Sequence, residues 1–443
     1  MTQPSTAQRQ GSAPQQRDHR GADPRRWPDV ATVPASPLRA RAAELLLRHV
    51  ARRLGLRVQL PGGALLNRTP PPPDAPVLRL RAPGDFFQRV GAGGLIGFGE
   101  SYQAGDWDSP DLIALLTVLA ASPGTLVPPR LQWLRRWFTP RRPAEQLGTP
   151  ENARRNIQAH YDLSNELFAL FLDPTLTYSS ALFATGPDGA PAASWDLLAP
   201  AQHRKIDRLL DLAGVGHGTR VLEIGTGWGE LALRAAARGA EVVTLTLSEE
   251  QQRLAEERIA AAGQADRVEV RLCDYRSATG QFDAVLSVEM VEAVGRDYWP
   301  AYFATLDRVL APGGRIALQA ITMPHDRMLA SLRTFTWIQK YIFPGGLLPS
   351  VEAVRTTLAR HTSLSLTERH GYGAHYAETL RLWRERFTAR ADEVAALGFD
   401  SVFQRMWTLY LAYSEAGFRS GYLDVQQLLL TREGDVPDGG LRS

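Results

Sequence analysis

An apolar segment at residues 219–224 runs into a turn with glycine at positions 225, 227 and 229, and a helical segment follows from Glu230. Glycine suits such a turn because the chain must bend sharply and leave bare backbone against a ligand. Further strands are expected at 241–247, 268–273, 282–288 and 315–321, with helices at 229–237, 249–262 and 299–310. Short apolar strands that alternate with helices indicate a parallel sheet covered on both faces. We therefore predict an α/β fold with a mostly parallel, Rossmann-like sheet.

The spacing of the turn narrows the choice of ligand. Its glycines form a G-x-G-x-G pattern, whereas a dinucleotide fingerprint has its third glycine one position later and a P-loop needs Gly-Lys-Ser/Thr. Polar residues follow the next two strands: Ser248, which we expect to cap a helix, with Gln251, and then Asp274. A class I methyltransferase binds the ribose and adenine of S-adenosylmethionine (SAM) at these strand ends. The combination predicts that SAM lies on the turn that begins at Glu223, and another nucleotide-binding fold remains the alternative.

The first third of the chain differs from the rest in charge. Residues 1–145 carry 20 Arg against 11 Asp or Glu, a net charge of +9, and the remainder carries −6. We expect a disordered tail over residues 1–35 and a membrane-associated accessory domain over residues 36–140, with helices at 38–54 and 112–121. Positive charge suits anionic lipid headgroups. The aromatic and arginine residues at 128–142 suit either a membrane interface or packing on the second domain.

No segment of the sequence has the length and apolarity of a transmembrane helix. The longest uncharged apolar run, at 112–122, is about half of the roughly 20 residues that a helix needs to cross a bilayer. The first residues also lack the apolar core of a signal peptide, and the single cysteine, Cys273, fits a reducing compartment. These features predict a cytoplasmic protein.

Motifs around the predicted core match a known family. They are IQAHYDLSNELF at residues 157–168, LEIG at 222–225, TLSEEQ at 246–251 and SVEMVE at 287–292. In this order and spacing they resemble the cyclopropane-fatty-acyl-phospholipid synthases and the related mycolic acid methyltransferases, over about residues 85–420. The resemblance implies a SAM-dependent methyltransferase domain over residues 150–430. It also implies a substrate, the double bond of an unsaturated phospholipid acyl chain, and a peripheral position at the inner face of the membrane.

The resemblance further implies roles for individual residues. Those implied to contact SAM are Tyr178, Ser179, Gly225, Gly227, Trp228, Thr246, Gln251, Asp274 and Tyr275. Glu292 is implied to face the reacting methyl group, Tyr376 to line the acyl channel near Trp383, and His160 to lie at the active-site entrance. The aromatic segment at 335–343 either lines an acyl tunnel or packs against the cap.

The sequence departs from the family at the proton-accepting site. The resemblance implies a bound bicarbonate as the base, held by a cysteine-containing turn, a glutamate, a histidine and a tyrosine. Glu292 and Tyr376 are kept, but Ser180 stands at the cysteine position and Gln319 at the histidine position, and a further histidine of the family is replaced by Ala293. Glutamine cannot carry the positive charge that favours an anion. Ser180 and Gln319 are therefore catalytic candidates, while the binding of bicarbonate stays open.

The product stays open for the same reason. Methylation of a double bond leaves a carbocation, which a carboxylate and aromatic faces stabilise. Loss of a proton from the new methyl group closes a cyclopropane, which is the family's reaction. Proton loss that forms a double bond instead of a ring leaves a methylene group or a shifted alkene, and reduction elsewhere would turn that into a methyl branch.

Other kinds of protein fit the sequence less well. A small-molecule methyltransferase and a catalytically silent lipid-binding protein remain alternatives, and a homodimer is left open. No metal site is predicted, because the histidines lack ligand spacing and Cys273 stands alone. No nucleic-acid substrate is expected, because the fourth strand is not followed by an Asn-Pro-Pro-Tyr motif.

Overall fold

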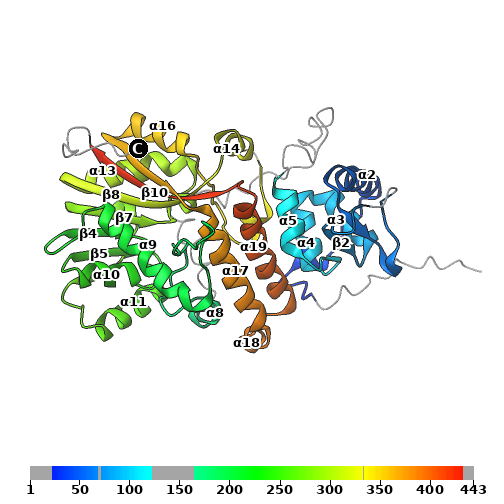
Figure 1. The fold of residues 1–443 in the computed structure, drawn as a ribbon, viewed down its shortest axis with the longest axis horizontal. Coiled ribbons are helices and arrows are strands. Elements are labelled where there is room, and N and C mark those ends of the chain that lie inside the picture. Colours follow the sequence, from blue (N-terminus) through cyan, green and yellow to red (C-terminus); the bar gives the residue numbers. More distant parts are fainter. Residues whose placement is uncertain (1–21, 68–70, 122–163, 333, 433–443) are drawn as a thin grey trace, which may run out of the picture.

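The computed structural model describes residues 22–67, 71–121, 164–332 and 334–432. Figure 1 shows them as two parts, a large sheet with its helices and a smaller N-terminal part that holds α2–α5. The helix α19 (Ser401–Arg419) joins the parts, because it packs on α17 (Gly373–Ala389) and also on α4 and α5. The expected boundary between accessory and methyltransferase domains, and the arginine-rich segment at 128–142, lie outside the described residues.

The large sheet has seven strands in the order β6-β5-β4-β7-β8-β10-β9. The strands β4 to β8 pair in parallel, and β10 runs antiparallel to both of its neighbours. The strands are β4 (Arg220–Ile224), β5 (Glu241–Thr246), β6 (Val268–Leu272), β7 (Phe282–Val288), β8 (Leu310–Thr322), β9 (Leu364–Gly371) and β10 (Asp424–Arg432). The mostly parallel α/β fold is confirmed. The five expected strands are all present, whereas β9 and β10 were not expected.

Helices cover both faces of this sheet, as Figure 1 shows. One apolar cluster joins one face of the sheet to α9 (Leu198–Leu212), α10 (Glu230–Ala237) and α11 (Glu249–Ala261). A second cluster joins the other face to α13 (Trp299–Val309) and α16 (Val351–His361). Because both faces are buried, the strands are apolar almost without interruption, which is the pattern seen in the sequence. Shorter helices are α8 (Asn165–Phe171), α12 (Val291–Val294), α14 (His325–Ser331), α15 (Trp337–Tyr341) and α18 (Ala391–Ala396).

The N-terminal part combines a small sheet with helices. Its three strands lie in the order β1-β2-β3. The elements are α1 (Pro28–Ala31), α2 (Pro37–Leu54), β1 (Arg57–Gln59), β2 (Val77–Leu80), α3 (Pro83–Gly93), α4 (Leu95–Gln103), β3 (Trp107–Asp108) and α5 (Leu112–Ala121). The expected helices at 38–54 and 112–121 are present as α2 and α5. Within the described residues, no helix is both long enough and apolar enough to cross a membrane.

The expected disordered tail over residues 1–35 is wrong at its C-terminal end. Residues 28–31 form α1, and Val30 is fully buried. The buried guanidinium of Arg89 holds this segment, because it donates to the carbonyl oxygens of Asp29 and Val30 while it pairs with Asp106 at 3.0 Å. Composition alone did not reveal this order, since the contacts come from a helix about 60 residues later in the chain.

The aromatic segment at 335–343 docks onto the N-terminal part. Trp337, in α15, donates from Nε1 to Gln103 Oε1 at 2.7 Å and lies against Gly99. Lys340 and the hydroxyl of Tyr341 both bond to the carboxylate of Glu100. The contacts of α15 are therefore those of a packing helix, and an acyl tunnel lined by this segment stays a prediction.

Candidate active site

The glycine turn lies where the carboxyl ends of the parallel strands meet, which is where open α/β sheets bind ligands. Gly225, Gly227 and Gly229 all have positive φ angles, of 98°, 52° and 89°. A Cβ added to Gly225 would lie 2.8 Å from the side chain of Met290, whereas one added to Gly227 would meet nothing within 4 Å. The turn therefore needs glycine, and open space borders its middle, as a bound cofactor requires.

Polar groups gather at the end of β5. The hydroxyl of Thr246 donates to Gln251 Oε1 at 2.9 Å, and Ser248 Oγ accepts from the backbone N–H of Gln251 at 3.2 Å. Ser248 is thus the N-cap of α11, as predicted. Thr246 and Gln251 lie side by side there, although their contact with the ribose remains a prediction.

The next positions are also held in place by local bonds. Asp274 Oδ1 accepts from the backbone N–H of Arg276 and both its carboxylate oxygens pair with the Arg276 guanidinium, at 2.8 and 2.6 Å. Tyr275 is buried and packs edge-on against Tyr302. These two residues follow β6, where the adenine is expected.

Glu223 is buried beneath the turn. It accepts a hydrogen bond from the hydroxyl of Thr244 at 2.7 Å, and Thr244 also contacts Thr226 in the turn itself. Burial raises the pKa of Glu223 to about 8. The structure thus ties Glu223 to β5 and the turn, and its direct contact with SAM remains a prediction.

Aromatic rings wall the space beside the turn. Trp228 is 3% exposed, donates from Nε1 to Asn165 Oδ1 at 2.8 Å and packs on Phe168. Tyr178 contacts the ring of Trp383, and its hydroxyl lies 2.7 Å from that of Tyr410. Further rings of this group are Phe171, Phe387 and Trp407. Tyr178 therefore lies among aromatic side chains, while His160 lies outside the described residues.

Three residues predicted for the base site meet around a carboxylate that was not predicted, that of Glu289. Glu289 Oε1 accepts from the backbone N–H of Ser180 at 3.0 Å and from Gln319 Nε2 at 2.8 Å. Its Oε2 accepts from the hydroxyl of Tyr376 at 2.7 Å. Ser180, Gln319 and Tyr376 are thus brought together as expected, and Glu289 is their common partner.

The side chain of Gln319 is oriented by its other contacts. Its Oε1 accepts from the hydroxyl of Tyr372 and lies 3.4 Å from Gln427 Nε2. Its Nε2 must therefore face Glu289 and the carbonyl of Ser180. Gln319 is a neutral donor in this position, and burial raises the pKa of Tyr372 well above its usual value, so that its hydroxyl stays protonated.

Glu292 follows three residues later in the chain, in α12, and is also buried. Its Oε1 accepts from the backbone N–H of Ile321, and among the described residues its Oε2 has no hydrogen-bond partner. Burial, and next the charge of Glu289, raise the pKa of Glu292 to about 8. At neutral pH Glu292 is therefore mostly protonated, which makes it a donor and a poor base; its place beside the reacting methyl group remains a prediction.

A buried cation lies near the carboxylate of Glu289. Lys205, in α9, is fully buried, and its Nζ donates to Ser179 Oγ at 2.7 Å. Burial lowers the pKa of Lys205 to about 8, and the charges of Glu289, Asp173 and Glu223 oppose this shift. Ser179 thus bonds to Lys205, while the predicted contact of Ser179 with SAM remains untested by this geometry.

The residues of this site that the sequence did not predict are Lys205, Glu289, Tyr372 and Gln427. For two of these residues, the sequence held a weak signal. Lys205 is one of two lysines among 50 basic residues, and Glu289 is the first glutamate of the SVEMVE motif. Tyr372 and Gln427 carried no signal, because they reach the site through β9 and β10.

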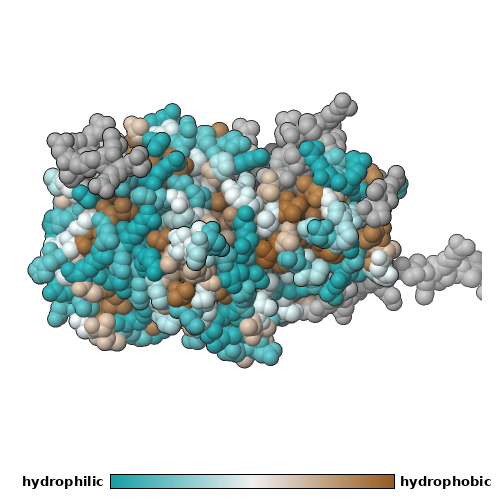
Figure 2. Space-filling model, viewed as in Figure 1, coloured by the Kyte–Doolittle hydropathy of each residue, from teal (hydrophilic) through white to brown (hydrophobic). Residues whose placement is uncertain are grey.

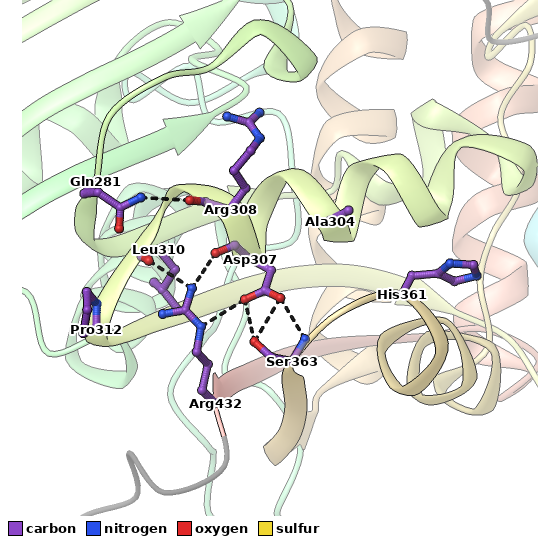
Figure 3. Close-up of a pocket in the computed structure, with 9 residues that line it drawn as sticks. All are labelled: Gln281, Ala304, Asp307, Arg308, Leu310, Pro312, His361, Ser363 and Arg432. Carbon is purple, nitrogen blue, oxygen red and sulfur yellow. Dashed lines mark hydrogen bonds and ion pairs between the residues drawn. The ribbon is translucent and has the colours of Figure 1, made fainter.

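The pocket in Figure 3 lies at the opposite edge of the sheet, beside the first residues of β7 and β8. There Arg432 and Ser363 both bond to Asp307, which fastens β9 and β10 to α13. None of the predicted site residues lines it. This pocket is therefore separate from the catalytic edge.

Known proteins share this fold and these motifs. The family described as mycolic acid cyclopropane synthetase matches residues 149–428. Tuberculostearic acid methyltransferase UfaA1 of Mycobacterium tuberculosis is 57% identical over 415 residues, which cover 93% of this chain and 96% of that relative. Cyclopropane-fatty-acyl-phospholipid synthase of Escherichia coli K12 is 35% identical over 360 residues, 80% of this chain and 87% of that relative.

A solved structure supports the same assignment. The crystal structure of mycolic acid cyclopropane synthase CmaA1 with SAH and CTAB matches with a TM-score of 0.56 and 32% identity, over 62% of this chain and 97% of that chain. The seven-stranded sheet, the open glycine turn and the polar ends of β5 and β6 fit SAM as the cofactor. This chain is a SAM-dependent lipid methyltransferase, and it belongs to the mycolic acid cyclopropane synthetase family.

Proposed function

We propose that this protein methylates a carbon of the double bond in an unsaturated fatty acyl chain of a phospholipid, and that its product is a methylene-branched chain and not a cyclopropane. The observation that carries this proposal is the 57% identity with tuberculostearic acid methyltransferase UfaA1 over 93% of the chain, against 35% with a cyclopropane synthase. A saturated methyl branch would need a further hydride and proton, which methyl transfer does not supply.

The site supports this chemistry through its walls and its carboxylates. SAM supplies an electrophilic methyl group. The π electrons of the alkene form the new carbon–carbon bond to this methyl group, and the electrons of the broken carbon–sulfur bond stay on sulfur. The alkene is a weak nucleophile, so its reaction requires close positioning in a dry site. The rings of Trp383 and Trp228 are buried and that of Tyr178 is half-buried, so they shield this space from water. Their faces, with the carboxylate of Glu289, stabilise the positive charge that develops on the chain.

The base site bears on which product forms. Ring closure and methylene formation both lose a proton, so they differ in where the carbocation lies when the base acts. Methylene formation requires a hydride to move first from the methylated carbon to its neighbour. Gln319 is a neutral donor where the family is expected to hold a histidine, and it leaves Glu289 as the group that meets the proton. A changed base is a physical reason for a changed product.

Product analysis tests the proposal. The protein is incubated with SAM and phospholipid vesicles whose chains carry one cis double bond, and the chains are released as methyl esters. Mass increases by one CH2 in either case, so proton NMR decides. We expect vinylidene signals, and high-field cyclopropyl protons would refute the methylene product. Vesicles with saturated chains are the control and should give no product.

We further propose that the protein works as a peripheral protein at the inner face of the cytoplasmic membrane. In α2, Leu38 and Leu45 are 86% and 63% exposed and lie two turns apart on one face, together with the exposed Arg41 and Arg52. Figure 2 shows hydrophobic residues (brown) among hydrophilic ones (teal) over the N-terminal part. Exposed leucines flanked by arginines suit an anionic lipid surface.

Vesicle sedimentation tests this surface. Leu45→Asp should weaken binding to anionic vesicles by about tenfold to a hundredfold, because insertion of one leucine contributes about 1.5–3 kcal/mol. Leu397→Asp is the matched control, since Leu397 is an exposed leucine (41%) at the end of α18. Equal binding of Leu45→Asp and the unmodified protein would contradict a membrane role for α2.

A further inference from the structure

The donors that the family resemblance assigns to bicarbonate already have an anionic partner within the chain. Ser180 N–H, Gln319 Nε2 and the Tyr376 hydroxyl all donate to the carboxylate of Glu289, at 2.7 to 3.0 Å. They stand at three of the four positions implied to hold the anion, and the fourth, Glu292, is itself a carboxylic acid. A carboxylate and a bicarbonate have the same charge and a similar planar pair of oxygens.

We propose that the carboxylate of Glu289 occupies the place of the bicarbonate and is itself the proton acceptor, so that the reaction needs no bicarbonate. This inference rests on the proposed function, because it assigns the base for methyl transfer to an alkene.

Bicarbonate does not fit the site as described. Both carboxylate oxygens of Glu289 accept hydrogen bonds from the donors of the site, so these donors are not available to a second anion. A second negative charge beside Glu289 would also be repelled in a buried site, where the effective dielectric constant is low. The family's histidine could have offset that charge when protonated, but Gln319 cannot.

The backbone holds Glu289 in an unusual conformation. Its φ is +54°, one of two positive φ angles among the non-glycine residues that the structure describes. Side chains disfavour this region, and such residues persist where surrounding contacts impose them. Here Glu289 N–H donates to the carbonyl of Gln319 at 2.7 Å, which fixes the turn after β7 and aims the carboxylate at the three donors.

The charges around the site suit a base that starts ionised. The buried ammonium of Lys205 favours the carboxylate form of Glu289, while Glu292 is mostly neutral at pH 7. Burial nonetheless raises the pKa of Glu289 above its usual value. A carboxylate with a raised pKa is a stronger proton acceptor than one in water.

The proton step balances within the chain and the substrate. After methyl transfer and the hydride shift, the methylated carbon carries the positive charge. The carboxylate of Glu289 removes a proton from the methyl group, and the pair of the broken carbon–hydrogen bond becomes the new double bond. Glu289 is then a neutral carboxylic acid, and it returns the proton to solvent once the product has left.

The first test uses the unmodified protein. Methyl transfer from SAM to monoenoic phospholipid vesicles is measured in buffer depleted of carbon dioxide and again after addition of sodium bicarbonate. We expect the two rates to agree within about twofold. A rate that falls on depletion and returns with bicarbonate would overturn the proposal. The assay counts transferred methyl groups whatever the product, so its result is independent of whether a methylene or a cyclopropane forms.

Two variants of Glu289 complete the test. Glu289→Gln keeps the shape but accepts no proton, so the rate should fall by about 10²–10⁴-fold and bicarbonate should not restore it. Glu289→Gly suits the positive φ and vacates the anion position, so bicarbonate should raise its rate at least tenfold. Binding of ¹³C-labelled bicarbonate, seen by NMR, should appear in Glu289→Gly and not in the unmodified protein.

Controls separate these effects from misfolding. SAM binding by calorimetry should be unchanged in both variants, and Glu352→Gln, at an exposed glutamate in α16, should behave as the unmodified protein. Full activity of Glu289→Gln would refute Glu289 as the base. A Glu289→Gly variant that neither binds nor responds to bicarbonate would show that Glu289 does not stand in an anion site.

Discussion

Replacement of Gln319 by leucine should change the pH at which the enzyme works. Leucine has nearly the volume of glutamine but offers no hydrogen bonds. The change removes the donor that lies 2.8 Å from Glu289 Oε1 and leaves the bonds from Ser180 and Tyr376 in place. It also removes the acceptor of the Tyr372 hydroxyl. The ionised form of Glu289 is thus stabilised less.

The size of the effect follows from that one bond. A hydrogen bond to a charged group contributes about 1.5–3 kcal/mol, and one pKa unit corresponds to about 1.36 kcal/mol. The pKa of Glu289, already raised by burial, should therefore rise by a further 1–2 units or so. A base is active when ionised, so activity is present above this pKa and is lost as the pH falls through it. The acid limb of the profile should move to higher pH by the same amount.

The assay is the pH dependence of kcat/KM for methyl transfer to monoenoic vesicles. Gln426→Leu is the matched control, because Gln426 is another buried amide, and its Nε2 bonds to Asp424 at 3.0 Å instead of to the base site. The control should leave the acid limb in place. If Gln319→Leu lowers the rate equally at every pH and leaves the limb unmoved, then Gln319 does not tune the base and the reasoning is wrong.

Three further changes test other parts of the structure. Glu292→Gln mimics the protonated acid. Because burial raises the pKa of Glu292 from 4.5 to about 8, its contribution to stability is fully present below pH 4.5 and is lost progressively as the pH rises to 8, so the variant should gain in Tm relative to the unmodified protein between about pH 5 and pH 8, with no further gain above pH 8. Gly225→Ala puts a Cβ 2.8 Å from Met290 at a φ of 98°, so calorimetry should show no SAM binding and denaturant unfolding a loss of about 1–3 kcal/mol. Gly99→Ala puts a Cβ 2.3 Å from the ring of Trp337, so it should lower the unfolding free energy by about 1–3 kcal/mol and leave SAM affinity unchanged. Unaltered stability in Gly99→Ala would contradict the tight packing of the two parts at α15.

The predictions that succeeded depend on neighbouring residues. Contacts within a few residues produce the strand, glycine turn and helix at 219–237 and the cap at Ser248. The prediction of SAM as the cofactor was based on these same local features. Apolar runs predicted β4 to β8, because strands buried on both faces must be apolar almost throughout. The strands β9 and β10 were not predicted. In β9, charged residues interrupt the apolar pattern, and this strand has only one neighbouring strand in the sheet.

By itself, the sequence determined the fold class and the cofactor, because short motifs encode turns, caps and strand ends, and its family motifs pointed to three residues of the base site, Ser180, Gln319 and Tyr376. Only the tertiary structure decided which glutamate these residues surround. Glu289 and Glu292 belong to one motif, yet the partners of Glu289 lie 109, 87 and 30 residues away in the chain. A positive φ after β7 turns one carboxylate toward them, while the other carboxylate is carried onto α12 and loses its charge through burial. Direction and burial are properties of the packed molecule, and no spacing within the motif specifies them.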